Sequence, residues 1–303
     1  MNTRSLLRDL RAALDRAAPG ERPVLLTATP AIPDVVKLID AFPKIYFCID
    51  DYAEIQHVDA DLVLPLERET LTVVDAVVAT AEKLVNTKRP PSGKGFYLPQ
   101  GVNFDHFSGE RPLPADLAAI PGPRIGFAGH LSLCCDLDLL RNMALARPNW
   151  SFVLVGPVSV DTAPIALPNV HLLGNRPYAD LPAYVQGFDV GIIPYIRNAW
   201  TQSVDPLKLL EYLAAGIPVV STSLPEVQKY SPPVRIADEP DAFRAAVELA
   251  LAEPSSTVEA RRAVARVQTW EQRAARLLEI VHELSSSEPR HQTSQSASTV
   301  KHS

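Results

Sequence analysis

Short apolar runs of strand type alternate with segments of helical spacing along most of the 303 residues. Strands that alternate with helices form a parallel sheet that helices cover on both faces. Four strands are expected before residue 100, at 24–27, 44–49, 76–80 and 94–98. Six more are expected after it, at 124–129, 151–156, 170–174, 189–194, 217–220 and 234–236. The alternation predicts an α/β fold built from two such units.

A proline-rich stretch separates the two units. Residues 111–123 hold four prolines, which is typical of an interdomain connection. The length of the chain also favours two domains. We expect a partial N-terminal domain at 1–118 and a C-terminal domain at 119–268, then a helix at 269–285 and a polar, disordered tail at 286–303.

The composition argues against several classes of protein. Hydrophobic residues make up 47% of the chain, which is too many for a disordered protein. The net charge is −6 and no long basic block occurs, so we expect no nucleic-acid partner. The start of the chain does not resemble a secretory signal, and no apolar run reaches the roughly 20 residues that span a bilayer. We expect a cytoplasmic protein, with peripheral contact at the inner face of the membrane left open.

Three cysteines are too few for a disulfide framework. Cys134 and Cys135 are adjacent and have no companion ligand at zinc spacing, whereas Cys48 lies in a strand-like run. We interpret Cys134 and Cys135 as loop or packing residues with reduced thiols.

Residues 205–222 read as a short helix followed directly by a buried strand. Asp205 is expected as the N-cap, Pro206 as the first helical residue and Gly216 as the residue just past the end. Lys208 then falls in the first turn, where the helix dipole disfavours a cation unless an anion such as a pyrophosphate also binds there. Glu211 projects from the same face three residues later. This pair predicts a nucleotide-sugar site, and the alternative is a capped surface helix with an intrahelical ion pair.

Four segments, in order and at matching distances, resemble the glycosyltransferases of family 4, also called group 1, in the branch related to teichuronic-acid and exopolysaccharide transferases. Weaker matches are Pro99-Gln100-Gly101-Val102-Asn103 and Thr269-Trp270. The four main segments are Ile125-Gly126-Phe127-Ala128-Gly129-His130-Leu131, Trp150-Ser151-Phe152-Val153-Leu154-Val155-Gly156-Pro157, Gly191-Ile192-Ile193-Pro194-Tyr195 and Pro206-x-Lys208-x-x-Glu211-Tyr212-Leu213-Ala214-x-Gly216-x-Pro218-Val219-Val220.

The resemblance implies a GT-B fold, in which two Rossmann-like parallel-sheet domains face a cleft, and a terminal helix that crosses back onto the first domain. The first domain is expected to be incomplete, because the family's usual first strands are not recognisable before residue 24. It also implies a metal-independent, hexosyltransferase-like enzyme that retains the anomeric configuration and needs no cofactor. By the same resemblance the donor substrate is expected to be a nucleotide-diphosphate sugar, namely a UDP-sugar.

The same resemblance implies roles for individual residues. Glu211 would accept hydrogen bonds from the ribose, and Lys208 would neutralise the diphosphate as the leaving group departs. The remaining donor-side residues would be Gly129 and His130 near the phosphates, Gly174, Asn175 and Arg176 near the base, and Tyr195, Asn198, Thr201, Ser203, Pro206 and Leu207 along the loop and helix start. Ser203 stands where the family often has a glutamate, and His130 where it often has an arginine.

Several of these residues have simpler alternatives. His130 is alternatively a solvated loop histidine, and Asn198 and Thr201 alternatively belong to an ordinary solvated loop. Asp50 and Asp51 end a strand on the side where ligands bind, so they are candidates for the acceptor side. Their alternative is a turn or a helix cap.

The predicted function is transfer of a sugar from a nucleotide-diphosphate sugar to a polysaccharide or lipid-linked acceptor. One alternative is a non-catalytic nucleotide-sugar-binding subunit or degenerate transferase, and another is a UDP-sugar epimerase. The expected partners are the donor and the glycan or lipid-linked acceptor. A partner protein and a peripheral membrane contact stay open.

Overall fold

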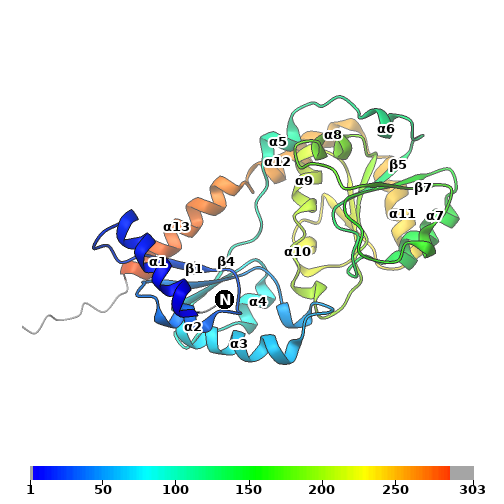
Figure 1. Ribbon diagram of the computed structural model, residues 1–303. Coiled ribbons are helices and arrows are strands. Elements are labelled where there is room, and N and C mark those ends of the chain that lie inside the picture. The colour runs from blue at the N-terminus through cyan, green and yellow to red at the C-terminus, as the bar shows by residue number, and fades with distance from the viewer. Residues whose placement is uncertain (1–2, 287–303) are drawn as a thin grey trace, which may run out of the picture.

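Two parallel sheets organise the computed structural model, which describes residues 3–286 (Figure 1). The first sheet has the order β1-β2-β3-β4, and the second has the order β10-β9-β8-β5-β6-β7. The first-sheet strands are β1 (Leu25–Thr27), β2 (Lys44–Cys48), β3 (Ala76–Ala79) and β4 (Gly95–Tyr97). The second-sheet strands are β5 (Arg124–Ala128), β6 (Ser151–Val155), β7 (Val170–Gly174), β8 (Val190–Ile193), β9 (Val219–Ser221) and β10 (Val234–Ile236).

Helices connect the strands, as the parallel pairing requires. Before the second sheet lie α1 (Thr3–Ala17), α2 (Pro33–Leu38), α3 (Ala60–Val73), α4 (Glu82–Thr87), α5 (Phe104–Ser108) and α6 (Ala115–Ala118). After its first strand come α7 (Leu137–Ala146), α8 (Leu181–Gln186), α9 (Lys208–Ala215), α10 (Pro225–Gln228), α11 (Pro240–Leu251), α12 (Val258–Arg266) and α13 (Trp270–Ser286). Short 3₁₀ turns lie at Tyr52–Glu54, Ala163–Ile165, Thr201–Ser203 and Ser255–Thr257.

The second sheet reverses its direction of growth next to β5. The chain moves outward from β5 through β6 to β7 and then returns to the other side of β5 as β8. In open parallel sheets, ligands bind beyond the carboxyl ends of the strands at such a reversal. The residues that follow β5 and β8 therefore lie where a ligand site is expected.

Both sheets are buried on two faces, which explains why their strands read as near-continuous apolar runs. All five residues of β6 and all four of β8 are buried. In the first sheet, Tyr46 and Val77 pack on one face with Leu84 of α4. Ile45 and Val78 face the opposite side.

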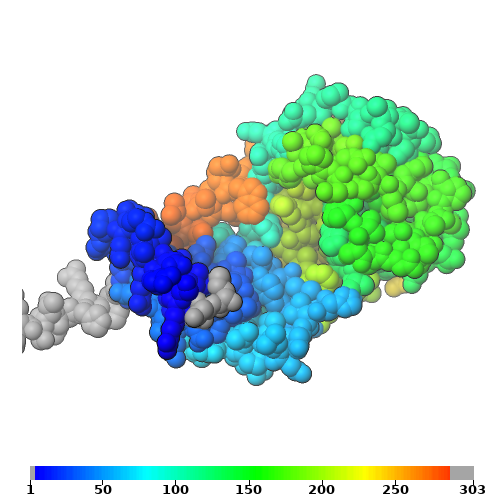
Figure 2. Space-filling view, in the orientation of Figure 1, coloured from blue at the N-terminus to red at the C-terminus, as the bar shows by residue number. Residues whose placement is uncertain are grey.

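The last helix, α13, covers that opposite face of the first sheet. Ile280 and Leu284 of α13 pack against Ile45 and Val78. The helix begins beside the chain that links the two sheets, where the amide of Trp270 donates to the carbonyl of Val102 over 3.3 Å. Figure 1 shows α13 running from the part that holds the second sheet to the part that holds the first. Figure 2 shows the two parts separated by a recess on the visible face.

The expected strands all form, but some helix boundaries differ. Helix α2 ends at Leu38, because Ile39 adopts an extended conformation. The short helices α5, α6 and α10 were not predicted from the sequence, since five residues or fewer carry no helical period. The tail expected at 286–303 lies, apart from Ser286, outside the described residues.

The start of α9 also differs from the expectation. The helix begins at Lys208 with Leu207 as its N-cap, so the predictions of Asp205 as N-cap and of Pro206 as the first helical residue were wrong. The Asp205 carboxylate instead accepts a hydrogen bond of 2.8 Å from the amide of Gln100. This contact joins the entry to α9 with the chain that leaves the first sheet. Gly216 ends the helix in the left-handed conformation at φ +85°, as predicted.

No helix in the described part of the chain is long and apolar enough to cross a membrane.

Candidate functional site

Lys208 lies at the reversal point of the second sheet, between the ends of β5 and β8. Its ammonium donates a hydrogen bond to the hydroxyl of Tyr195, two residues beyond β8. The ammonium also lies 5.1 Å from the ring centroid of Phe127 in β5 and 4.6 Å from that of Tyr195. Such cation–π contacts hold a lysine without neutralising its charge.

The charge of Lys208 has no carboxylate partner in the described part of the chain. Burial lowers the pKa of Lys208, while the charges of nearby groups, Cys135 first, oppose that shift. A half-buried cation without an ion pair, on the first turn of a helix, favours an anionic ligand.

Two glycines bring the backbone close to Lys208. An alanine Cβ at Gly129 would lie 2.8 Å from Cε of Lys208, and φ at Gly129 is +149°. A Cβ at Gly156 would lie only 2.0 Å from the carbonyl oxygen of Gly129. Tyr212 of α9 supports the same strand end, because its hydroxyl accepts a 2.7 Å hydrogen bond from the amide of Ala128. The end of β5 thus approaches the lysine, and the end of β6 approaches that of β5, more closely than side chains would allow.

Glu211 lies on the same face of α9, one turn after Lys208. Its side chain is buried, with 8% exposure, and accepts no hydrogen bond from any described residue. Burial raises the pKa of Glu211 to about 7, against the opposing charge of Lys208. A buried carboxylate without a donor is costly, and hydroxyl groups of a ligand would satisfy it.

The predicted base-side residues follow β7. The carbonyl of Gly174 accepts a 2.9 Å hydrogen bond from the amide of Gly156, so the ends of β5, β6 and β7 are adjacent. Asn175 is exposed. Arg176, however, is paired with Asp116 of α6 at 2.8 Å and donates to Tyr184 at 2.7 Å. Its guanidinium is therefore held by the protein itself, and contact with a base stays a prediction.

The loop between β8 and α9 is organised by its own side chains. The Thr201 hydroxyl donates to the carbonyl of Ile196 over 2.6 Å and is fully buried. The amides of Asn198 and Thr201 each donate to the other residue's side chain. These hydrogen bonds shape the loop, and contact of Asn198 and Thr201 with the donor stays a prediction.

The other predicted donor-side residues differ in exposure. His130 is exposed, and its side chain makes no contact with described residues that would fix it. Pro206 is buried and Leu207 is half-buried at the entry to α9. Ser203 is fully buried, and its hydroxyl has no hydrogen-bond partner among the described residues.

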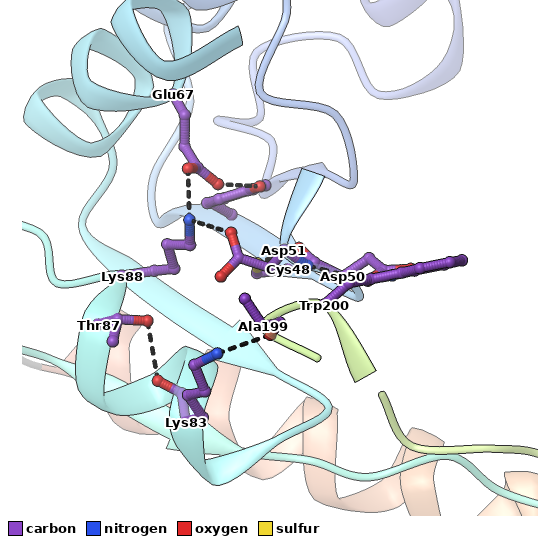
Figure 3. A network of polar contacts seen from close by, with 10 residues as sticks. Cys48, Asp50, Asp51, Glu67, Lys83, Thr87, Lys88, Ala199 and Trp200 are labelled. Carbon is purple, nitrogen blue, oxygen red and sulfur yellow. Dashed lines mark hydrogen bonds and ion pairs between the residues drawn. The ribbon is translucent and has the colours of Figure 1, made fainter. Parts of the chain in front are cut away.

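Asp50 and Asp51, at the end of β2, have different surroundings (Figure 3). Asp51 pairs with Lys88 at 2.9 Å, and Lys88 also pairs with Glu67 at 2.7 Å. The Asp51 carboxylate thus belongs to a buried ion-pair network, and its acceptor-side role stays a prediction. Asp50 instead accepts a 2.7 Å hydrogen bond from the indole Nε1 of Trp200, in the loop after β8.

Two features near Lys208 and Glu211 were not foreseen as parts of a site. Cys134 and Cys135 pack in the core as expected. The hydrogen bond from Cys135 lowers the pKa of Cys134, and the nearby charge of Lys208 acts in the same direction. Tyr178 stacks on His106 with ring centroids 4.7 Å apart. Burial raises the pKa of Tyr178, and the nearby charge of Glu211 raises it further. Only the fold brings these residues together.

The described residues contain no group of three or more His, Cys, Asp or Glu side chains that could hold a metal ion.

Comparison of the sequence with known proteins gives two matches. A family model described as glycosyl transferases group 1 matches residues 122–253. The chain is 30% identical over 279 residues to TuaH of Bacillus subtilis (strain 168), which is named as a teichuronic acid biosynthesis glycosyltransferase. The matched region covers 84% of this chain and 70% of that protein.

Solved structures show the same fold at low sequence identity. Sucrose-phosphate synthase from Thermosynechococcus elongatus aligns with a TM-score of 0.71 and 16% identity, over 93% of this chain and 78% of that chain. Anabaena Alr3699/HepE, solved in complex with UDP-glucose, aligns with a TM-score of 0.70 and 14% identity, over 93% and 82%. The expected GT-B type α/β fold, with two parallel-sheet units, is confirmed.

Proposed function

Because this chain belongs to the group 1 glycosyl transferases, we propose that it moves a sugar from a UDP-sugar to a polysaccharide or lipid-linked acceptor. One observation carries the donor part of this proposal. On one face of α9, a half-buried cation lies one turn before a buried carboxylate, and the described residues give the first no carboxylate partner and the second no hydrogen-bond donor. A nucleoside diphosphate complements both groups at once.

Lys208 would bind the diphosphate. Its ammonium is held by Tyr195 and Phe127 through contacts that leave its charge available. Negative charge on the diphosphate grows as the sugar leaves, so the lysine would stabilise the transition state more than the ground state. The N-terminus of α9 and the close backbone of Gly129 would add to this stabilisation.

Glu211 would accept hydrogen bonds from the ribose hydroxyls. Charge-assisted hydrogen bonds of this kind are stronger than neutral ones. The adjacent ends of β6 and β7, with Gly174 and Asn175, would lie toward the base. Support for uridine comes from the similarity to HepE, which was solved with UDP-glucose.

The remaining parts of the proposal rest on the family. A polysaccharide or lipid-linked acceptor is supported by the similarity to TuaH. Retention of anomeric configuration and metal independence follow from the family resemblance, and Lys208 supplies the positive charge that a metal-independent reaction needs. A partner protein, peripheral membrane contact and a cytoplasmic location stay predictions.

Calorimetry with UDP, ADP and GDP tests the donor part. We expect UDP to bind to the wild type and to bind more weakly to Glu211→Gln. A saturating nucleotide should also stabilise the fold, by about 2.7 kcal/mol at 100 times its dissociation constant. Failure of UDP to bind the wild type would overturn the donor assignment.

Consumption of UDP-glucose, UDP-N-acetylglucosamine and UDP-glucuronate tests the reaction itself. Release of UDP that depends on an added acceptor supports transfer. UDP binding without release from any of these donors would favour a non-catalytic subunit. Conversion of the donor sugar without an acceptor would favour an epimerase.

A further inference from the structure

The carboxylate of Asp50 differs from those of Asp51 and Glu67, because no cation of the described residues pairs with it. Lys88 pairs with both Asp51 and Glu67, whereas the described residues place no ion pair on Asp50. Burial raises the pKa of Asp50. Oδ1 accepts hydrogen bonds from Trp200 Nε1 and from the amide of Asp51, while no described donor reaches Oδ2. One carboxylate oxygen of Asp50 is therefore available to a ligand.

Trp200 reaches Asp50 from the other part of the molecule. Its ring packs partly against the core of the second sheet and is half-buried. The hydrogen bond from Nε1 to Asp50 fixes the orientation of the ring relative to the carboxylate. Figure 3 shows the Asp50 side chain directed toward Trp200, on the side away from Lys88.

The loop that carries Trp200 also holds the donor lysine. It starts at Tyr195, whose hydroxyl accepts the hydrogen bond from Lys208. The contacts between Asn198 and Thr201 stiffen the segment before and after Trp200. Asp50 therefore contacts, through Trp200, the same loop that contacts Lys208 through Tyr195.

A carboxylate held against an indole provides the two kinds of contact that a sugar ring needs. The carboxylate accepts hydrogen bonds from hydroxyl groups, and the aromatic face packs against the apolar C–H face of the ring. We propose that Asp50 and Trp200 form a subsite that binds a pyranose ring of the acceptor. This inference rests on the proposed transfer reaction and adds an acceptor subsite shared between the two sheets.

A different role for the pair is to tie the two parts of the molecule together. Lys83 of α4 makes such a tie one residue away, where its ammonium donates to the carbonyl of Ala199 over 2.8 Å. This contact joins the same loop to the first sheet without involving the carboxylate. Lys83→Met is therefore a matched control, because it removes an interdomain contact and leaves Asp50 and Trp200 in place.

Saturation-transfer NMR with methyl α-D-glucopyranoside, methyl N-acetylglucosaminide and methyl glucuronide tests the subsite. We expect at least one glycoside to bind the wild type. Asp50→Asn, which keeps the shape of the side chain, should weaken that binding about ten-fold through loss of the charged acceptor. Trp200→Leu should weaken it to a similar degree, and Lys83→Met should not.

Three results would overturn the proposal. The first is that none of the three glycosides shows saturation transfer with the wild type. The second is that wild type and Asp50→Asn bind a glycoside equally well. The third is that Asp50→Asn and Lys83→Met lose glycoside binding to the same degree. Calorimetry with UDP on the same samples reports separately on the donor site. Failure of UDP to bind the wild type would argue against the proposed function. The comparison of glycoside binding between wild type and variants tests the acceptor subsite alone.

Discussion

The ammonium of Lys208 donates a hydrogen bond to the hydroxyl of Tyr195, and this bond joins the first turn of α9 to the loop after β8. Tyr195 is buried, so the bond fixes the lysine at the reversal point of the second sheet. The cation is thereby positioned before any ligand arrives. Preorganised charges of this kind stabilise a transition state without the cost of rearrangement.

Replacement of Lys208 tests its role in transfer. We expect Lys208→Met to lower kcat about 10²–10³-fold, the size of effect seen when one preorganised charge-stabilising group is removed. Steady-state release of UDP from the preferred UDP-sugar measures the effect. Tyr195→Phe is the matched variant, because it keeps the cation and the aromatic ring and should cost far less. Wild-type kcat in Lys208→Met would contradict the assignment.

The affinity for UDP should depend on pH through Glu211. The folded protein holds the pKa of Glu211 at about 7, and only the ionised carboxylate accepts hydrogen bonds from both ribose hydroxyls. UDP affinity should therefore fall as the pH is lowered through 7. Calorimetry between pH 5.5 and 8.5 measures this, with Glu211→Gln as the control that should bind weakly at every pH. A wild-type affinity that does not change across that range would argue against the ribose contact.

The same carboxylate should reduce the stability of the unliganded fold at neutral pH. Its pKa is about 7 when folded and 4.5 ordinarily, so the folded state binds the proton more tightly. The free energy of unfolding therefore decreases as the pH rises from 4.5 to 7, and the carboxylate is most costly above 7. Glu211→Gln should stabilise the ligand-free protein by about 1–3 kcal/mol at pH 8 and much less at pH 4.5. Urea unfolding at the two pH values checks the difference, and equal effects at both would contradict it.

Gly156 should tolerate alanine far less than Gly174. Both have positive φ, of +142° and +70°, but a Cβ at Gly156 would lie 2.0 Å from the carbonyl oxygen of Gly129, whereas Gly174 has open space. Gly174→Ala should cost about 1–2 kcal/mol for its backbone conformation alone. Gly156→Ala should cost more than about 3 kcal/mol, because the end of β5 must also move. Thermal unfolding of both variants measures the difference, and equal losses of stability would contradict this explanation.

The network around Lys88 should contribute strongly to the stability of the first sheet. Lys88→Met would leave the buried carboxylates of Asp51 and Glu67 without a counter-charge, at a cost of about 3–5 kcal/mol. Urea unfolding measures this, with Lys83→Met as a control that removes a half-buried lysine of α4 outside the network. Similar stabilities for the two variants would show that the network is not needed.

The ten strands could be predicted because each is short, apolar and bounded by polar or turn residues, which is a local property of the sequence. Lys208 and Glu211 could be placed on one face by their spacing alone. The start of α9 could not be predicted correctly, because Asp205 is drawn to the amide of Gln100, 105 residues away. Capping preferences reflect hydrogen bonds between residues close in sequence, so they cannot predict that a distant backbone amide will bind the side chain instead.

The sequence by itself determined the alternation of strands and helices, the two parallel sheets that follow from it and the lysine–glutamate pair of the donor face. Only the tertiary structure decided that Asp51 is neutralised by Lys88 while Asp50 meets Trp200, although the two aspartates are adjacent in the chain. Successive side chains at the end of a strand point in different directions, so neighbours in sequence enter different surroundings. What each carboxylate can bind depends on the charges and donors that distant segments bring to it.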